Sequence, residues 1–225
     1  MKNIVFDHVV KAYDKNVIVK DLNMEIREGE RLILLGPSGC GKSTTLRMIA
    51  GLERLSGGNL YMDGRLVNDV PCGERNVSMV FQNYALFPNM TVRDNIAYGV
   101  KIRKYPKQKI KEKCDYYMEL SGLKEFEHRR IQELSGGQQQ RVAIARALAS
   151  EAKVLLADEP TGNLDEDTAR EIIELIKKTA HELGKCVIVV THSKQLAEEA
   201  DVVLAINQGV LHEQECLKEN LLEKL

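Results

Sequence analysis

A glycine-rich stretch, GPSGCGKST at residues 36–44, has residue types and a spacing suited to binding phosphate. It matches the pattern GxxxxGK[ST] and stands between a short apolar run and a region expected to be helical. The backbone N–H groups of such a loop, together with the positive end of the helix that follows, attract the oxygens of a nucleoside triphosphate. The sequence therefore predicts a phosphate site made by Gly36, Pro37, Ser38, Gly39, Cys40, Gly41, Lys42, Ser43 and Thr44.

Two of these side chains are expected to contact the triphosphate and its metal ion directly. The ammonium of Lys42 should bridge the β- and γ-phosphates, and the hydroxyl of Ser43 should bind Mg²⁺. The alternative is a glycine-rich turn that binds nothing. The strand–loop–helix context disfavours that alternative.

Two adjacent carboxylates follow a second apolar run, VLLADE at residues 154–159. Ligands of open α/β sheets bind at the carboxyl ends of the strands, which is where Asp158 and Glu159 are expected to lie. Asp158 is predicted to hold Mg²⁺, and Glu159 to polarise an attacking water as a general base. The alternative for an isolated pair is two solvated carboxylates at a turn before Pro160.

A second helix start suited to an anion lies at residues 134–141, LSGGQQQR. Ser135 is a good N-cap, and Gly136 and Gly137 leave the next backbone N–H groups uncovered. If this segment and the phosphate loop mark separate surfaces of one chain, a head-to-tail pair of chains places one of each around every nucleotide. An ordinary capped helix is the alternative for this segment taken alone.

The elements around these residues alternate between strands and helices. Residues 3–35 are expected to form short strands, 87–149 a mostly helical insertion, and 154–190 two strands around one helix; 202–212 are typical of a closing hairpin. Strands alternating with helices predict a mainly parallel sheet with helices on both faces. The strand-rich beginning predicts an added antiparallel layer.

The composition excludes several classes of protein. The 225 residues include 32 basic and 33 acidic side chains, a net charge of −1, which argues against nucleic acid as a partner. The basic run 101–113 is more simply a solvated helical face. The sequence has no apolar stretch of the roughly 18 residues that span a bilayer, so a membrane role is expected through partner chains. Five cysteines without a CxxC pair predict reduced thiols in the cytosol.

Together, GPSGCGKST, LSGGQQQR and VLLADEP resemble, in order and spacing, the motifs of the ABC ATPase family, and the resemblance covers essentially the whole chain. It implies a P-loop NTPase fold, a RecA-like mainly parallel sheet with an antiparallel β layer and an inserted α-helical subdomain. One nucleotide-binding domain over 1–225 would divide into a core, 1–86 and 150–225, and a helical subdomain, 87–149, with the signature Ser135, Gly136, Gly137 and Gln138. ATP is then the substrate and Mg²⁺ its cofactor.

The resemblance also implies roles for isolated residues. Tyr13 is similar to the aromatic that stacks on adenine, although taken alone it is more typical of a half-buried strand residue. Gln82 resembles the glutamine that reaches Mg²⁺ and the attacking water. His192 resembles the switch histidine on the γ-phosphate, and Asp165 the aspartate that contacts the opposite subunit. Asp165 is equally an N-cap candidate.

The expected setting is a transporter, with polytopic membrane subunits, a second nucleotide-binding subunit and a solute-binding protein, at the cytoplasmic face of the membrane. Residues 71–99 most resemble importers of sugars, polyamines or oxyanions, whereas DEPTGNLD resembles short exporter or lipoprotein-releasing subunits. The chain is expected to lack the C-terminal regulatory domain of many importers, because it stops at Leu225. A non-transport ABC ATPase would carry the same nucleotide motifs, and a simple P-loop kinase would share the phosphate loop but not LSGGQQQR.

Overall fold

The computed structural model describes residues 3–197 and 200–213 and contains two β-sheets. The larger sheet has the strand order β10-β9-β3-β8-β7-β6, and all neighbours are parallel except the β9–β10 hairpin. The smaller sheet, β2-β1-β4-β5, is antiparallel. This is the predicted fold class. The strands are β1 (Asn3–Tyr13), β2 (Asn16–Arg27), β3 (Arg31–Leu35), β4 (Gly57–Met62), β5 (Arg65–Leu66), β6 (Val77–Val80), β7 (Val154–Asp158), β8 (Cys186–Thr191), β9 (Val202–Asn207) and β10 (Val210–Glu213).

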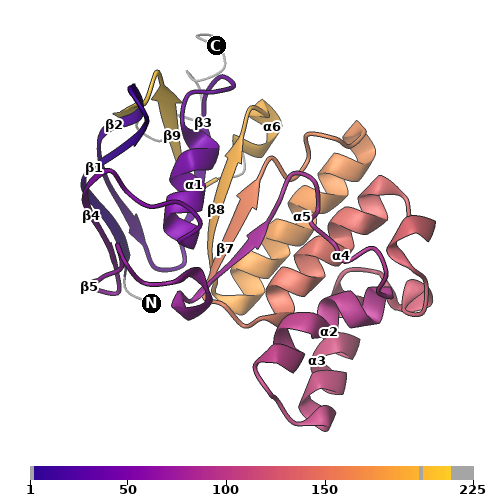
Figure 1. Ribbon diagram of the computed structural model, residues 1–225. Coiled ribbons are helices and arrows are strands. Elements are labelled where there is room, and N and C mark those ends of the chain that lie inside the picture. Colours follow the sequence, from indigo (N-terminus) through magenta and orange to yellow (C-terminus); the bar gives the residue numbers. More distant parts are fainter. Residues whose placement is uncertain (1–2, 198–199, 214–225) are drawn as a thin grey trace.

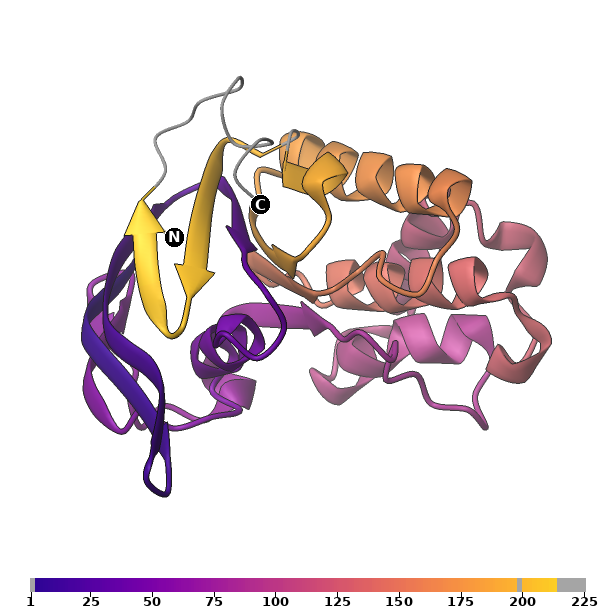
Figure 2. The same cartoon turned by 90° about the horizontal axis from the view of Figure 1, so that it is seen from above.

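Helices cover both faces of the larger sheet, as Figures 1 and 2 show. Helix α1 lies between the two sheets, and α4 and α5 pack on the opposite face. The helices are α1 (Lys42–Ala50), α2 (Val92–Ile102), α3 (Lys107–Leu120), α4 (Gly136–Ala149), α5 (Glu166–Leu183) and α6 (Lys194–Ala197), with short 3₁₀ turns at Cys72–Glu74, Lys124–Phe126 and Ile131–Glu133. The stretch expected to be helical thus contains α2, α3 and α4.

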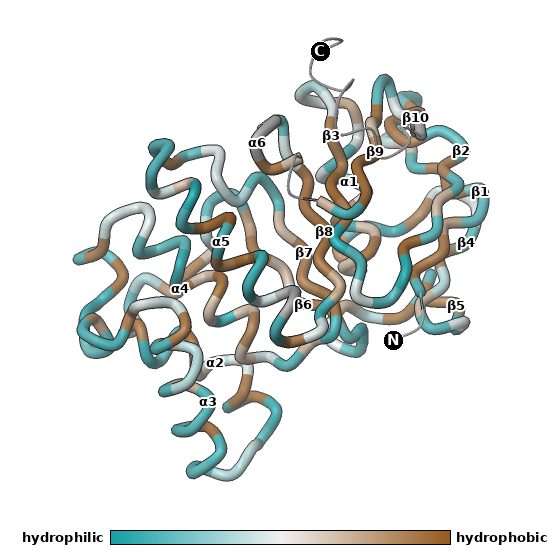
Figure 3. The backbone as a smooth tube through the Cα atoms, turned by 180° about the vertical axis from the view of Figure 1, so that it is seen from behind, coloured by the Kyte–Doolittle hydropathy of each residue, from teal (hydrophilic) through white to brown (hydrophobic). Residues whose placement is uncertain are grey.

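Two separate hydrophobic cores lie on the two faces of the larger sheet. In β3, Leu32 and Leu34 belong to the core shared with α1 and the antiparallel sheet, whereas Ile33 and Leu35 belong to the core shared with α2–α5. Side chains of a strand alternate between faces, so one apolar run serves both cores. Figure 3 shows the apolar strands β3, β7 and β8 at the centre and the more polar α3 at the periphery.

The first two strands differ from the expectation of several short strands. They are 11 and 12 residues long and pair with each other from Asn3–Arg27 to Tyr13–Asn16. Shifts in their register, with His8 and Asp21 in the left-handed region, interrupt the alternation of polar and apolar residues. A bulged strand therefore looks like two short ones in the sequence.

Helix α2 opens the region expected to be helical, and a side chain caps its N-terminus. Thr91 is the N-cap, and its Oγ1 accepts from the backbone N–H of Asp94 at 3.1 Å. In a capping box, the Asp94 carboxylate would accept from the Thr91 backbone N–H. The carboxylate instead accepts from the Thr91 hydroxyl at 3.0 Å. An aspartate is one methylene shorter than the glutamate usual at that position.

Arg75 fixes the end of the helix that carries the phosphate loop. Only 5% of this residue is exposed, and its guanidinium donates to the carbonyls of Met48 and Ile49, in the last turn of α1, at 2.7 and 3.0 Å. It also donates to the carbonyls of Val67 and Val70 at 2.6 and 2.9 Å. Burial lowers the pKa of Arg75. One cation therefore ties α1 to the segment that follows β5.

We expect Arg75→Lys to destabilise the protein by about 2 kcal/mol or more, because an ammonium cannot reach all four carbonyls and each buried unpaired acceptor costs about 1–3 kcal/mol. Urea unfolding followed by circular dichroism measures the change. Arg65→Lys is the matched control, since Arg65 is an exposed residue of β5. Equal midpoints for the two variants would contradict this role for Arg75.

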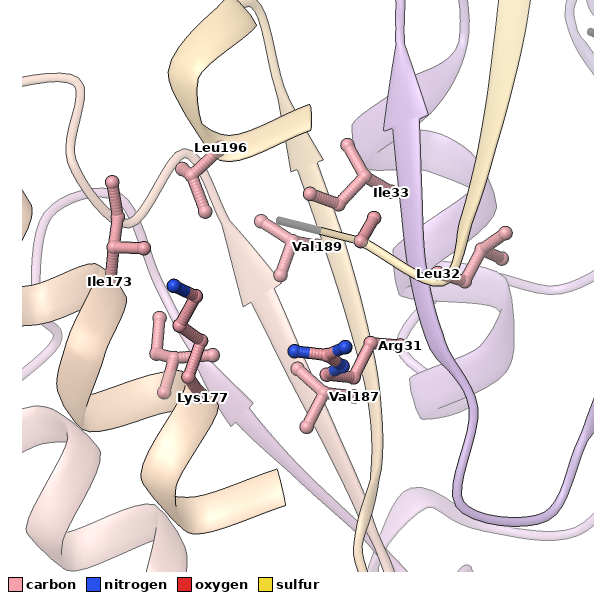
Figure 4. Close-up of a pocket in the computed structure, with 10 residues that line it drawn as sticks. Arg31, Leu32, Ile33, Ile173, Lys177, Val187, Val189 and Leu196 are labelled. Atoms are coloured by element: carbon pink, nitrogen blue, oxygen red, sulfur yellow. The ribbon is translucent and has the colours of Figure 1, made fainter. Parts of the chain in front are cut away.

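A small apolar pocket lies between α5, α6 and the larger sheet (Figure 4). Ile173 of α5, Leu196 of α6 and Val189 of β8 line it, with the side chain of Lys177 beside them. Its volume is about 20 Å³, enough for a water molecule at most. Substrate chemistry therefore has to be sought elsewhere, at the edge of the sheet where the strands end.

Candidate nucleotide site

The glycine-rich loop joins β3 to α1 at the carboxyl edge of the parallel sheet, as predicted. Gly36 has no room for a side chain, because an added Cβ would lie 2.2 Å from the carbonyl oxygen of Ile206. Gly41 precedes α1 with φ of 107°, a conformation that favours glycine. Helix α1 ends at Gly51, which is also left-handed and donates its N–H to the last carbonyls.

Lys42 is folded back over this loop. Its Nζ donates to the carbonyl oxygens of Gly36 at 2.6 Å and Pro37 at 2.9 Å, and the residue is only 6% exposed. The ammonium is thus held at the centre of the loop by neutral acceptors. A phosphate group entering there would offer it charged oxygens, which bind an ammonium more strongly.

Two of the three residues predicted to bind metal, Ser43 and Asp158, lie in direct contact. The hydroxyl of Ser43 donates to the Asp158 carboxylate at 2.7 Å, across 115 residues of sequence. Asp158 ends β7 and is 5% exposed, so a buried carboxylate oxygen and a hydroxyl face each other. Hydroxyl and carboxylate oxygens are ligands that Mg²⁺ prefers, and this donor set fits that ion.

Glu159 and His192, two of the predicted catalytic residues, also meet. The Glu159 backbone N–H donates to the carbonyl of Val190 in β8 at 2.9 Å, which anchors the residue beside the neighbouring strand. One carboxylate oxygen of Glu159 lies 3.0 Å from Nδ1 of His192. The Glu159 backbone has φ of 46°, which is unfavourable for a residue with a side chain and recurs at functional sites.

Gln82 is not brought into this cluster. Its side chain is exposed, and its backbone carbonyl accepts from the amide of Asn163 at 3.3 Å. Among the residues that the structure describes, its side chain makes no hydrogen bond with Ser43 or Asp158. The role of Gln82 toward the metal and the water stays a prediction.

The signature segment, residues 134–141, opens α4. Ser135 is the N-cap: its Oγ accepts from the N–H of Gln138 at 3.3 Å, and the Gln138 side-chain oxygen accepts from the Ser135 N–H at 2.9 Å. This reciprocal capping box confirms the predicted helix start. The side chain of Ser135 is therefore held at the helix N-terminus, where backbone N–H groups attract anions.

The second glycine of this segment lies against α5. A Cβ added at Gly137 would be 2.4 Å from the Cγ2 methyl of Thr168. Thr168 in turn donates its N–H and its hydroxyl to the carboxylate of Asp165 at 3.0 and 2.8 Å. Both hydrogen bonds lower the pKa of Asp165, and the bond from the Thr168 backbone has the larger effect. Asp165 is thus the N-cap of α5, and its contact with an opposite subunit stays a prediction.

We expect Gly137→Ala to destabilise the protein by about 1–3 kcal/mol, the usual cost of inserting a methyl group into a packed contact. Thr168→Ser in the same chain should restore most of the loss, because it removes the Cγ2 methyl and keeps the hydroxyl that bonds Asp165. Thermal unfolding of the two single variants and the double variant measures this. Additive losses would show that the methyl contact is not the cause.

Tyr13 lies at the end of β1, on the antiparallel sheet. Its ring is 40% exposed, and the ammonium of Lys11 lies 4.5 Å from the ring centre. Lys11 also forms an ion pair with Glu53 at 3.0 Å. An exposed ring suits stacking on a flat base, although the ring's adenine contact stays a prediction.

Two residues of α4 with long-range contacts are not predicted from the sequence. Gln140 is fully buried, and its amide donates to the carbonyl of Pro160 at 2.6 Å, one residue after Glu159. Arg146 donates to the carbonyls of Tyr84 and Ala85. The only signal in the sequence is a polar residue among the apolar positions of a helix, which does not identify a partner.

Among the described residues, the cysteines form no disulfide. Cys40, Cys72, Cys114 and Cys186 are free. Cys216 lies outside the described residues. Burial raises the pKa of Cys186 to about 12, so this thiol stays protonated at neutral pH.

Comparison with known proteins gives one consistent family. The family model "ABC transporter" matches residues 19–162. The chain is 46% identical over 215 residues to the putative uncharacterized ABC transporter ATP-binding protein YcjV of Escherichia coli K12, covering 95% of this chain and 60% of that protein. It is 48% identical over 195 residues to the oligosaccharides import ATP-binding protein MsmX of Bacillus subtilis, covering 86% and 53%. Identity to the spermidine/putrescine import ATP-binding protein PotA of Acetivibrio thermocellus is 45% over 215 residues, covering 94% and 61%.

Solved structures agree with this family. The dimeric cassette MJ0796, in a post-hydrolysis state with ADP and Pi, superposes with a TM-score of 0.83 at 33% identity, covering 93% of this chain and 98% of that one. CbiO1 of Clostridium perfringens, part of the ABC transporter complex cbiONQ, gives a TM-score of 0.86 at 29% identity, covering 93% and 86%.

The chain spans about 60% of the length of the curated relatives it matches most fully. Within the described residues, the helices are too short or too polar to cross a bilayer. The family match includes the phosphate loop, the signature segment and the acidic pair, which are the same segments that form the geometry above. This chain belongs to the ABC transporter family and carries its ATP-binding cassette.

Proposed function

We propose that this chain hydrolyses ATP as one half of a head-to-tail pair and thereby drives a transporter. The observation that carries the proposal is the grouping of Lys42, Ser43–Asp158 and Glu159–His192 along one sheet edge, while Ser135 opens a different element, α4. The chain thus has two anion-binding elements, and a nucleotide held by the first leaves the second for a partner's nucleotide. The MJ0796 cassette is itself dimeric in the solved structure.

The residues divide the chemistry between them. Lys42 exchanges its carbonyl partners for the β- and γ-phosphates. Ser43 and Asp158 would hold Mg²⁺, which would supply positive charge to neutralise the phosphates. Glu159 orients the attacking water and accepts its proton, and His192, already beside Glu159, contacts the γ-phosphate. Closure of the pair by Ser135, Gly136 and Gly137 of the partner chain excludes water from the site.

Mixing two inactive variants tests the head-to-tail arrangement. Lys42→Ala spoils only the phosphate loop, and Ser135→Arg spoils only the signature segment. In a head-to-tail mixed pair, both substitutions lie in one ATP site and the other site is intact. Half of the pairs in an equal mixture are mixed, so the mixture should recover up to about a quarter of the wild-type rate. If the mixture stays as inactive as each variant alone, the pairing is not head-to-tail.

The contact with membrane subunits is assigned to the segment after Gln82. Phe87 packs against Tyr98 of α2 with ring centres 4.2 Å apart. Beside this pair lies a surface groove of about 450 Å³, lined by Met90, Asp94, Tyr98, Lys101 and Ile102. Ile102, one of the residues that line the groove, is 63% exposed, so the groove offers apolar as well as charged side chains to a partner. A cytoplasmic segment of a polytopic membrane subunit fits this description, and it would hold the ATPase at the membrane.

Import is the direction that the relatives favour. MsmX and PotA are named for import of oligosaccharides and of spermidine/putrescine. The transported solute here would be small and polar, delivered by a solute-binding protein. The test is to copurify the membrane partners and place the complex in sealed vesicles. The measurement is whether solute moves into or out of the compartment that holds ATP. Movement toward that compartment supports import; movement away supports the alternative, an exporter or lipoprotein-releasing subunit.

A further inference from the structure

Arg146 joins the end of α4 to the loop that follows Gln82. Its Nη1 donates to the carbonyl oxygen of Ala85 at 2.7 Å, and its Nη2 to that of Tyr84 at 3.1 Å. The centre of the guanidinium lies 5.7 Å from the centre of the Phe87 ring. Tyr84, Ala85 and Phe87 of the loop therefore all contact one side chain of α4.

The environment of this cation is unusual. Among the described residues, no carboxylate lies within ion-pair distance of Arg146, so its partners are neutral. Burial lowers its pKa. Arg146 is half-buried, so its charge is partly withdrawn from water without an opposite charge, a cost that a leucine or methionine at this position would not carry. The fork of N–H donors, which those residues lack, is what the position requires.

The loop that Arg146 holds has a strained backbone. Tyr84 and Ala85 both lie in the left-handed region, with φ of 62° and 46°. Side chains disfavour that region, so two successive residues there need support from their surroundings. The two carbonyls that Arg146 binds are those of these two residues. The turn begins two positions after Gln82.

The same loop also touches the other end of α4. The hydroxyl of Tyr84 lies so close to Gly136 that a Cβ added at that glycine would be 3.3 Å from it. Gly136 is the first residue of α4, next to the N-cap Ser135, whereas Arg146 is in the last turn. Tyr84 therefore contacts α4 at both ends, through its hydroxyl at Gly136 and through its carbonyl at Arg146.

We infer that Arg146 is a positioning residue, which holds the loop after Gln82 in its left-handed turn, thereby sets the position from which Gln82 can reach the nucleotide, and makes this loop move together with the signature helix α4. The inference rests on the proposed function and on the predicted role of Gln82 toward the attacking water. A shift of Phe87, which packs beside the proposed membrane-subunit groove, would then reach Ser135 through one rigid unit.

The test is a double-mutant cycle on ATP turnover by the full chain. Arg146→Lys keeps the charge but cannot bond two carbonyls as a fork, and it should lower kcat at least tenfold with a KM for ATP within threefold of wild type. In a Gln82→Ala background the same substitution should change kcat by less than twofold, because its effect passes through Gln82. Arg103→Lys is the control. Arg103 donates to the carbonyl of Ser150, the C-cap of α4, and within the described part of the chain it does not contact the loop after Gln82, so this variant should retain full turnover.

A second variant removes the dependence on how well Arg146→Lys folds. Ala85 is exposed, and Ala85→Val opposes the left-handed turn without entering the core. It should give the same loss of kcat, again only when Gln82 is present, with a melting temperature near that of wild type. Equal losses with and without Gln82, or full turnover in both variants, would overturn the inference. A wild-type chain without any ATP turnover would instead overturn the proposed function.

Discussion

Glu159→Gln should abolish steady-state ATP turnover while leaving ATP binding intact. The amide cannot accept the proton of the attacking water, and loss of a general base lowers a rate by about 100- to 10,000-fold. Glutamine has nearly the shape of glutamate, so the backbone at φ of 46° and the anchoring bond to Val190 should persist. Phosphate release measures the rate.

The same variant should accumulate as an ATP-bound pair of chains, because hydrolysis is the step expected to open the pair. Sedimentation with and without ATP measures the assembly. Glu166→Gln is the matched control: Glu166 is an exposed residue of the first turn of α5, and its variant should turn over ATP and stay unpaired. Unimpaired turnover of Glu159→Gln, with no ATP-dependent pairing, would exclude Glu159 as the base.

Lys42→Ala should lose nucleotide binding and turnover together. The ammonium now bonds the carbonyls of Gly36 and Pro37 and is placed to meet the phosphates instead. Removing one such donor from the developing charge of a transition state costs about 100- to 1,000-fold in rate, and weaker binding of the ground state adds to it. Binding of a fluorescent ATP analogue and phosphate release measure the two effects.

A change elsewhere on the same helix separates this effect from a loss of fold. Arg47 is the exposed cation of α1, and Arg47→Ala should bind ATP normally. Circular dichroism should show that Lys42→Ala keeps its secondary structure. If Lys42→Ala kept the wild-type affinity for ATP and the wild-type rate of turnover, residues 36–44 would not be the phosphate site.

The sequence predicts the elements of this site because each motif is local. The phosphate loop needs only a strand, a glycine-rich turn and a helix, and the helix expected after the loop, α1, begins at Lys42. Carboxylates at the end of an apolar run predict Asp158 and Glu159 at the sheet edge for the same reason. Local rules suffice where a function is built from consecutive residues.

The contacts that join distant segments could not be predicted in this way. The pairing of Glu159 with His192 follows from the neighbouring positions of β7 and β8 in the sheet, an order that the sequence does not state. Arg75 and Arg146 bond backbone carbonyls, which every residue has, so no residue type marks their partners. Long-range hydrogen bonds to the backbone are therefore the part of the site that needed a structure.

The division of the interior into two cores has a consequence for how such a chain can diversify. Substitutions that share no neighbours are close to additive in their effects on stability. The helix of the phosphate loop, α1, packs in one core, and α2, which lines the proposed groove, packs in the other. Substitutions that adapt the groove to a new membrane partner can therefore accumulate without disturbing the packing that holds the ATP-binding loop.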